Sequence, residues 1–124
     1  MSHGASIYST NFIPWEEFRD FVLSLKDELP EITISVASSY PEVGLYRGKE
    51  WMLVVLRHQT NDPERLLEDM SLARGTEQKT LLILDMNSLP LAKTLARAFA
   101  RRYPCLFLFT AEPQDNQELL AEDF

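Results

Sequence analysis

The stretch LLILDMNSLPLAKTLARAFARRYPCLFLF, residues 81–109, constrains the fold more than any other part of the chain. It begins with one apolar run, at 81–84, and ends with another, at 105–109. Between them Leu91, Leu95 and Phe99 recur at steps of four, which predicts a helix with one buried face before Pro104. Strand–helix–strand units with short links form right-handed crossovers, so we predict that the strands on either side of this helix are parallel.

The first half of the chain predicts one helix followed by three strands. Pro14 suits a first helical turn, and an apolar residue at every third or fourth position then predicts a helix over 14–29. Residues 31–38 alternate between apolar and polar, which is typical of a half-buried strand, and 43–47 predict a short second strand. The run 51–56 is apolar throughout, which favours a strand covered on both faces.

A further helix is predicted from Asp62 to Gly75, which are its N-cap and C-cap. The predicted fold class is therefore α/β, with the element order α-β-β-β-α-β-α-β. We expect a mixed sheet of about five strands with helices packed on it. The strands 51–56, 81–85 and 105–109 are predicted to be central, and 32–37 to lie nearer an edge.

The chain has 124 residues, which suits one domain. We assign residues 11–110 to that domain, treat residues 1–10 as a flexible start, and treat residues 111–124 as an acidic tail. Net charge is −7, and the tail contains five acids and no base, so the body is close to neutral. Such charge asymmetry bears on the choice of partner more than on the fold.

Cys105 is the single cysteine, so an intrachain disulfide is impossible and a core position in a reducing compartment is expected. The sequence contains neither a signal-peptide pattern nor an apolar run of the roughly 20 residues that a bilayer-spanning helix needs. We therefore expect a cytoplasmic protein without a membrane partner.

The order of the first six elements resembles the common core of restriction-endonuclease-like nucleases. Such enzymes hold Mg²⁺ with an acid on the second strand and an acid-x-Lys motif on the third. Here Glu42 precedes the predicted second strand, and the third, WMLVVLRH, contains no acid. The resemblance therefore implies a catalytically silent domain that binds nucleic acid, for which the basic helix 91–103 is the candidate surface.

A strand-edge site is a second possibility. If the three central strands were parallel, their carboxyl ends would bring together a small polar group, namely His58, Asp85, Asn87, Thr110 and Glu112. Two carboxylates and an imidazole can hold a metal or share a proton, which is the basis of a small-enzyme alternative. The structural interpretation is that Asp85 ends a strand and helps to cap the next helix. The sequence contains no nucleophile motif, metal-ligand spacing or phosphate-binding glycine loop, so we predict neither a cofactor nor catalysis.

Two segments are candidates for binding. Lys93, Arg97 and Arg101 are spaced by four and form one basic ridge. The tail combines its acids with Leu119, Leu120 and Phe124, which favours a docking peptide, whereas a purely solubilising tail is the alternative. The function predicted first is a small soluble protein-interaction module, such as a regulator, adaptor or immunity-type inhibitor. Nucleic-acid binding through the basic ridge and a small enzyme at the Asp85 edge remain open.

Overall fold

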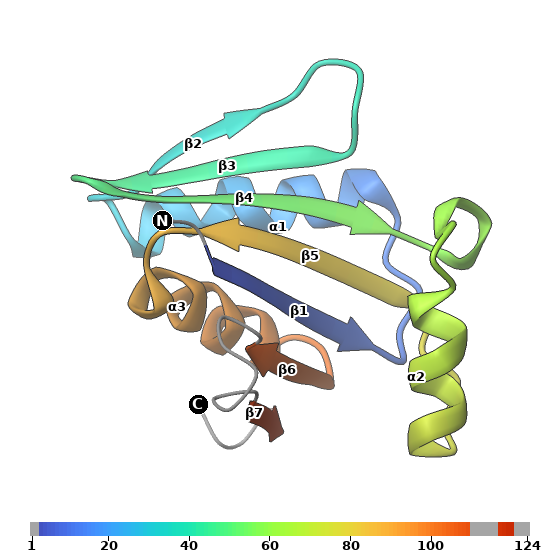
Figure 1. The fold of residues 1–124 in the computed structure, drawn as a ribbon. Helices are drawn as coiled ribbons and strands as arrows, with labels where there is room; N and C mark the ends of the chain where they lie inside the picture. Colours follow the sequence, from blue (N-terminus) through green and yellow to red (C-terminus); the bar gives the residue numbers. More distant parts are fainter. Residues whose placement is uncertain (1–2, 110–116, 121–124) are drawn as a thin grey trace.

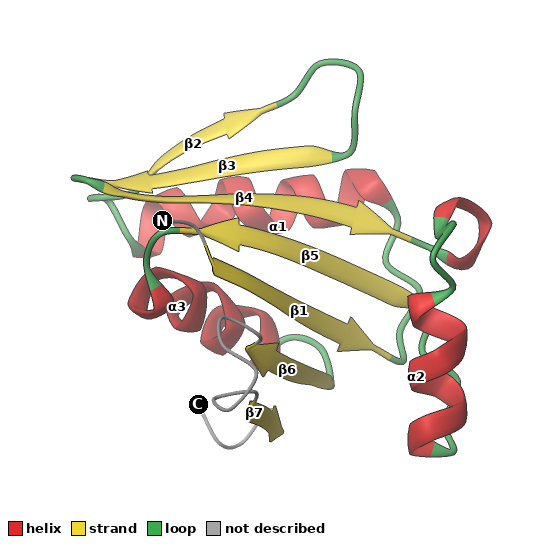
Figure 2. Ribbon diagram, in the orientation of Figure 1, coloured by secondary structure: helices red, strands yellow, loops and turns green. Residues whose placement is uncertain are grey.

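The computed structural model describes residues 3–109 and the backbone of 117–120, which form one antiparallel sheet with three α-helices (Figures 1 and 2). The strand order is β2-β3-β4-β5-β1-β6-β7. The strands are β1 His3–Ser9, β2 Thr33–Val36, β3 Glu42–Arg47, β4 Glu50–Arg57, β5 Thr80–Met86, β6 Cys105–Phe109 and β7 Gln117–Leu120. The helices are α1 Trp15–Glu28, α2 Leu66–Arg74 and α3 Leu89–Ala100, with a 3₁₀ turn at Gln59–Asn61.

The predicted α and β composition and the order of elements from α1 to β6 are confirmed. The predicted parallel pairing is wrong, because every ladder in the described sheet is antiparallel. The strands β5 and β6 do run in the same direction, but β1 lies between them and pairs with both. The N-terminal strand thus occupies the place where a parallel pair was expected.

The assignment of residues 1–10 to a flexible start is wrong for His3–Ser9, which form β1 near the middle of the sheet (Figure 1). Ile7 is completely buried, in register with Leu82 on one side and Phe107 on the other. The end of β1 is fixed by a hydrogen bond of 2.9 Å from the Ser9 hydroxyl to the carbonyl oxygen of Pro104.

Helices α1 and α3 cover one face of the sheet and form the main core with it (Figure 2). Their apolar faces contribute an aromatic cluster in which Phe99 contacts Phe18, Phe21 and Tyr103, with ring centroids 6.5, 5.7 and 4.9 Å apart. The start of α3 is capped by Ser88, whose hydroxyl accepts a hydrogen bond of 3.2 Å from the backbone N–H of Leu91. The N-cap of α3 is therefore Ser88.

Helix α2 lies beside the end of the sheet where β1 ends and β5 begins (Figure 1). It starts at Leu66, four residues after the predicted cap, because Arg65 adopts a left-handed conformation with φ 58°. Asp62 still satisfies a backbone donor, since its Oδ2 accepts a hydrogen bond of 2.7 Å from the N–H of Leu67. Gly75 ends the helix with φ 68°, as predicted.

Strand β4 has helices on one face only, which corrects the expectation that it is covered on both faces. Its side chains alternate: Met52, Val54 and Leu56 are buried in the main core, whereas those at 51, 53, 55 and 57 are half-buried. In the part of the chain that the structure describes, no helix is long and apolar enough to cross a membrane.

Candidate interaction surface

The face of the sheet opposite α1 and α3 presents apolar side chains, with the charged residues Glu42, Asp85 and Arg57 among and beside them. Side chains of a strand alternate between the two faces, so the residues in register with the outward-facing ones of β4 share this open face. Seven apolar residues face outward on this side, and we call them together the open-face patch. They are Tyr46, Trp51, Leu53, Val55, Ile83, Leu106 and Leu108. Tyr46 is 38% exposed and the other six are half-buried.

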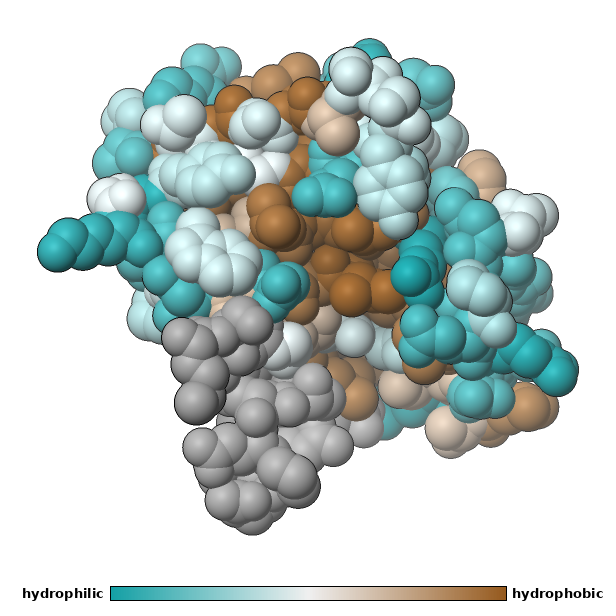
Figure 3. Space-filling model, turned by 45° about the horizontal axis from the view of Figure 1, so that its top comes forward, coloured by the Kyte–Doolittle hydropathy of each residue, from teal (hydrophilic) through white to brown (hydrophobic). Residues whose placement is uncertain are grey.

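These side chains come from β3, β4, β5 and β6, with β1 between β5 and β6. Tyr46 on β3 is opposite Trp51 on β4, and Val55 on β4 is opposite Ile83 on β5. Beyond β5, the small residue Ser6 of β1 separates Ile83 from Leu108 of β6. Figure 3 shows hydrophobic residues gathered in the centre of the molecule in this view, with hydrophilic residues around them.

Gly44 shapes the β3 side of the patch. A Cβ at this position would lie 2.7 Å from the Tyr46 hydroxyl and 2.9 Å from Cε2 of the same ring. The aromatic ring therefore lies over the glycine and covers backbone that would otherwise face solvent. A ring held against the sheet in this way extends the flat apolar surface of β4 towards the edge.

Helix α2 covers the other end of the open face. Leu67 of α2 packs with Tyr8 and Leu81 in a second buried cluster, against which Ile83, Leu106 and Leu108 are only partly buried. Burial raises the pKa of the Tyr8 hydroxyl, with smaller contributions from the nearby carboxylates of Asp62 and Asp69. The α2 helix thus covers part of an apolar face and leaves the rest without a helix among the described residues.

Charged groups stand within and beside the patch. Asp85 lies on β5 in register with Leu53 on one side and Gly4 on the other, and its side chain is exposed. Arg57 also faces this side, and its guanidinium lies 3.8 Å from the Asp62 carboxylate and 3.5 Å from that of Glu64. The guanidinium is therefore already paired with acids of its own chain, and Asp85 is not one of them.

Two members of the predicted strand-edge site, His58 and Asp85, are not brought together. In the antiparallel β4–β5 pair Arg57 is opposite Leu81, so His58 follows β4 at the end of the sheet where β5 begins. Asp85 lies four residues further along β5, about 13 Å from Leu81 at the rise of an extended strand. The Glu112 and Thr110 positions lie outside the described residues. Within the described residues, no group of three potential ligands is placed to hold a metal ion.

His58 has a structural environment. Its Nε2 lies 2.7 Å from the backbone carbonyl oxygen of Ile13, and its ring stacks on Phe12 with centroids 4.4 Å apart. Asn87 is similarly occupied, because its side chain accepts a hydrogen bond from the N–H of Trp51 and donates one to the carbonyl oxygen of Lys49. Both residues therefore hold neighbouring backbone in place, and neither turns a reactive group toward Asp85.

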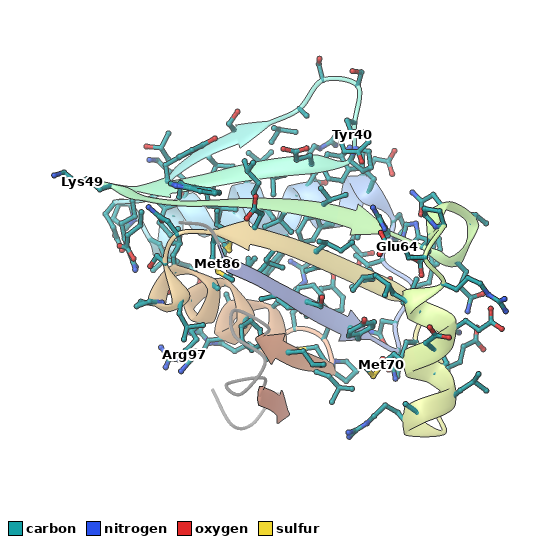
Figure 4. The ribbon with its side chains drawn as sticks, viewed as in Figure 1. Tyr40, Lys49, Glu64, Met70, Met86 and Arg97 are labelled. Atoms are coloured by element: carbon teal, nitrogen blue, oxygen red, sulfur yellow. The ribbon has the colours of Figure 1, made fainter. Side chains whose placement is uncertain are left out.

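The basic ridge lies on the helix-covered side of the molecule. Lys93 and Arg97 lie on α3 and Arg101 follows its last turn, with Arg97 pointing away from the sheet (Figure 4). Arg101 is 3.7 Å from Glu28 of α1, in a contact between two exposed side chains. Such a pair is worth about 0–1 kcal/mol, so it leaves the guanidinium accessible. The ridge exists as predicted, on the side opposite the open-face patch.

The tail candidates are only partly described. Leu119 and Leu120 belong to β7, whose backbone pairs with β6, but their side chains are outside the description, as is Phe124. Cys105 is buried in the core as predicted, and burial raises the pKa of its thiol to about 11. A thiol in this environment is protonated at neutral pH and is not a nucleophile.

A surface hollow that the sequence does not indicate lies between the β2–β3 loop and the start of α1. It has a volume of about 390 Å³, and its lining includes Trp15, Tyr40 and His58. Tyr40 is 53% exposed on the loop (Figure 4). The one imidazole among its lining residues already bonds the Ile13 carbonyl.

Comparisons with protein-family models, with curated proteins and with solved structures found no match for this chain. The resemblance to restriction-endonuclease-like nucleases is therefore limited to the order of elements.

Proposed function

We propose that this protein works by binding another protein through its open-face patch, as an adaptor, regulator or inhibitor-type module. The observation that supports the proposal is the group of seven apolar side chains on a sheet face that, among the described residues, α2 covers only in part. Monomeric proteins rarely expose contiguous apolar surface of more than a few hundred Å², and larger patches mark binding sites. Two of the seven are Tyr46 and Trp51, the residue types that contribute most at protein interfaces.

The alternatives have weaker support. The basic ridge has three cations, one of which lies against Glu28. The net charge of the whole chain is −7, which opposes binding to the negatively charged nucleic-acid backbone. For an enzyme, His58 is already hydrogen-bonded and Cys105 is buried with a raised pKa. We therefore place binding through the open face before nucleic-acid binding and before catalysis.

The test is a single substitution in the middle of the patch. Leu53→Asp places a carboxylate at the centre of the surface while leaving the buried face of β4 unchanged, so the fold should persist. Leu23→Asp is the matched control, because Leu23 is 46% exposed on α1, on the other side of the sheet. Both variants are first checked by circular dichroism and urea unfolding.

Wild-type protein and both variants are then immobilised and exposed to extract from the native cell, and captured proteins are identified and purified. We expect a partner that binds wild type and Leu23→Asp and whose affinity for Leu53→Asp falls at least about tenfold, as for a central contact residue. If every captured protein bound Leu53→Asp as tightly as wild type, the open-face patch would not be the binding surface.

A further inference from the structure

Asp85 places a carboxylate inside the open-face patch, and this inference rests on the function proposed above. On β5 its register partners are Leu53 and Gly4, and the next outward-facing residue of the same strand is Ile83. Its side chain is exposed. Among the described residues, no side chain forms a hydrogen bond or ion pair with its carboxylate.

A partner that covers the patch also covers Asp85. Removing a carboxylate from water without giving it a positive or hydrogen-bonding partner costs more free energy than the surrounding apolar contacts contribute to binding. Arg57, a cation of this chain on the same face, is already paired with Asp62 and Glu64. The partner therefore has to bring the donor that neutralises Asp85.

A second copy of this chain is a poor source of that donor. Two open faces packed against each other would supply the paired Arg57 and, from the β3–β4 turn at the edge of the sheet, Lys49, while the exposed cations of the basic ridge remain on the far side of the sheet. Each copy also has a net charge of −7, which opposes association of like chains. A different protein with a basic group in its contact surface fits the charge of this face better.

The neighbouring aromatic residues favour arginine over lysine as that group. Trp51 lies on β4 opposite Asn87, so it is a diagonal cross-strand neighbour of Asp85, within reach of a long side chain. A guanidinium can form two parallel hydrogen bonds to a carboxylate and at the same time stack on an indole ring. An ammonium group can make the charge contact without the flat stacking surface.

We propose that the open-face patch binds a segment of another protein in which an arginine lies among apolar residues, its guanidinium paired with Asp85 and stacked on Trp51. Around it, Leu53, Val55 and Ile83 contact the apolar residues of that segment. The negative charge of the whole chain speeds the encounter with such a basic segment.

The experiment uses a random 16-residue peptide library displayed on phage, selected on the full-length protein and counter-selected on Leu53→Asp. The enriched sequences are synthesised, and their affinities are measured by fluorescence anisotropy. We expect arginine at one fixed position between apolar residues. Asp85→Asn should weaken binding at least about tenfold, as should replacing that arginine by glutamine, and replacement by lysine should have a smaller effect. Asp27→Asn, an exposed acid on α1, is the matched control and should bind like wild type.

The possible outcomes separate the two proposals. Peptides that depend on Leu53 but show no fixed arginine, or that bind Asp85→Asn as well as wild type, would overturn the arginine inference and leave the binding surface in place. A selection that yields no peptide dependent on Leu53 would overturn both. Concentration-dependent dimers in sedimentation velocity that Leu53→Asp abolishes would identify a second copy as the occupant and also refute the arginine inference.

Discussion

Replacing Ile7 by alanine tests whether β1 is a central strand. Ile7 is completely buried in the main core, between Leu82 and Phe107 in the two neighbouring strands. The substitution removes three carbon atoms, which corresponds to about 2.4 kcal/mol of transfer free energy at roughly 0.8 kcal/mol per group. Because neighbours on three sides are fixed in strands and helices, the cavity closes only partly, and we expect a total loss of about 3–4 kcal/mol.

The assay is urea unfolding followed by far-UV circular dichroism. With a slope of about 1.5 kcal/mol per molar urea, typical of a domain of this size, the midpoint should fall by about 2 M. Leu72→Ala is the control, because Leu72 is 77% exposed on α2 and its truncation should change stability by less than about 0.5 kcal/mol. If Ile7→Ala shifted the midpoint no more than Leu72→Ala does, residues 3–9 would not be a core strand.

Three further predictions concern caps and titrating groups. Ser88→Ala removes the N-cap of α3 and should lower the free energy of unfolding by about 1 kcal/mol, measured in urea; an unchanged value would mean that the cap is not used. Hydrogen bonds from Arg47 and Ser88 lower the pKa of Glu50 below its ordinary 4.5, so folding gains stability from this carboxylate above that pH and loses it as pH falls through the lowered pKa. Glu50→Gln should therefore flatten the acid limb of stability against pH, and an identical limb would contradict this. The thiol of Cys105 should react slowly with Ellman's reagent at pH 8 in native protein and rapidly in urea, because burial raises its pKa to about 11; fast native labelling would show that it is exposed.

The elements that sequence periodicity predicted well are those whose own residues form a clear apolar pattern. Helix α1 spans Trp15–Glu28 against a predicted 14–29, since Pro14 and Pro30 limit it and its apolar stripe is continuous. Strands β4, β5 and β6 each fall on their apolar runs. The alternation of β2 correctly indicated an edge strand.

The strand β1 was missed because its sequence is short, polar at alternate positions and next to the start of the chain. Only Ala5 and Ile7 reach the main core, and Tyr8 reaches the cluster under α2. The local sequence of β1 does not indicate that this strand pairs with β5 on one side and β6 on the other. The antiparallel pairing of β4 with β5 separates His58 from Asp85, because His58 follows the end of β4 beside Leu81.

The sequence by itself determined which segments from α1 to β6 become helices and strands, because periodicity and caps act over a few residues. It also determined that Cys105 belongs to the core and that Lys93, Arg97 and Arg101 form a ridge. Only the tertiary structure decided which apolar side chains of β4 are buried. A continuous apolar run in the sequence fits a strand covered on both faces and a strand covered on one face equally well. The open-face patch and the place of Asp85 within it depend on register between strands far apart in the chain, and register is set by long-range packing.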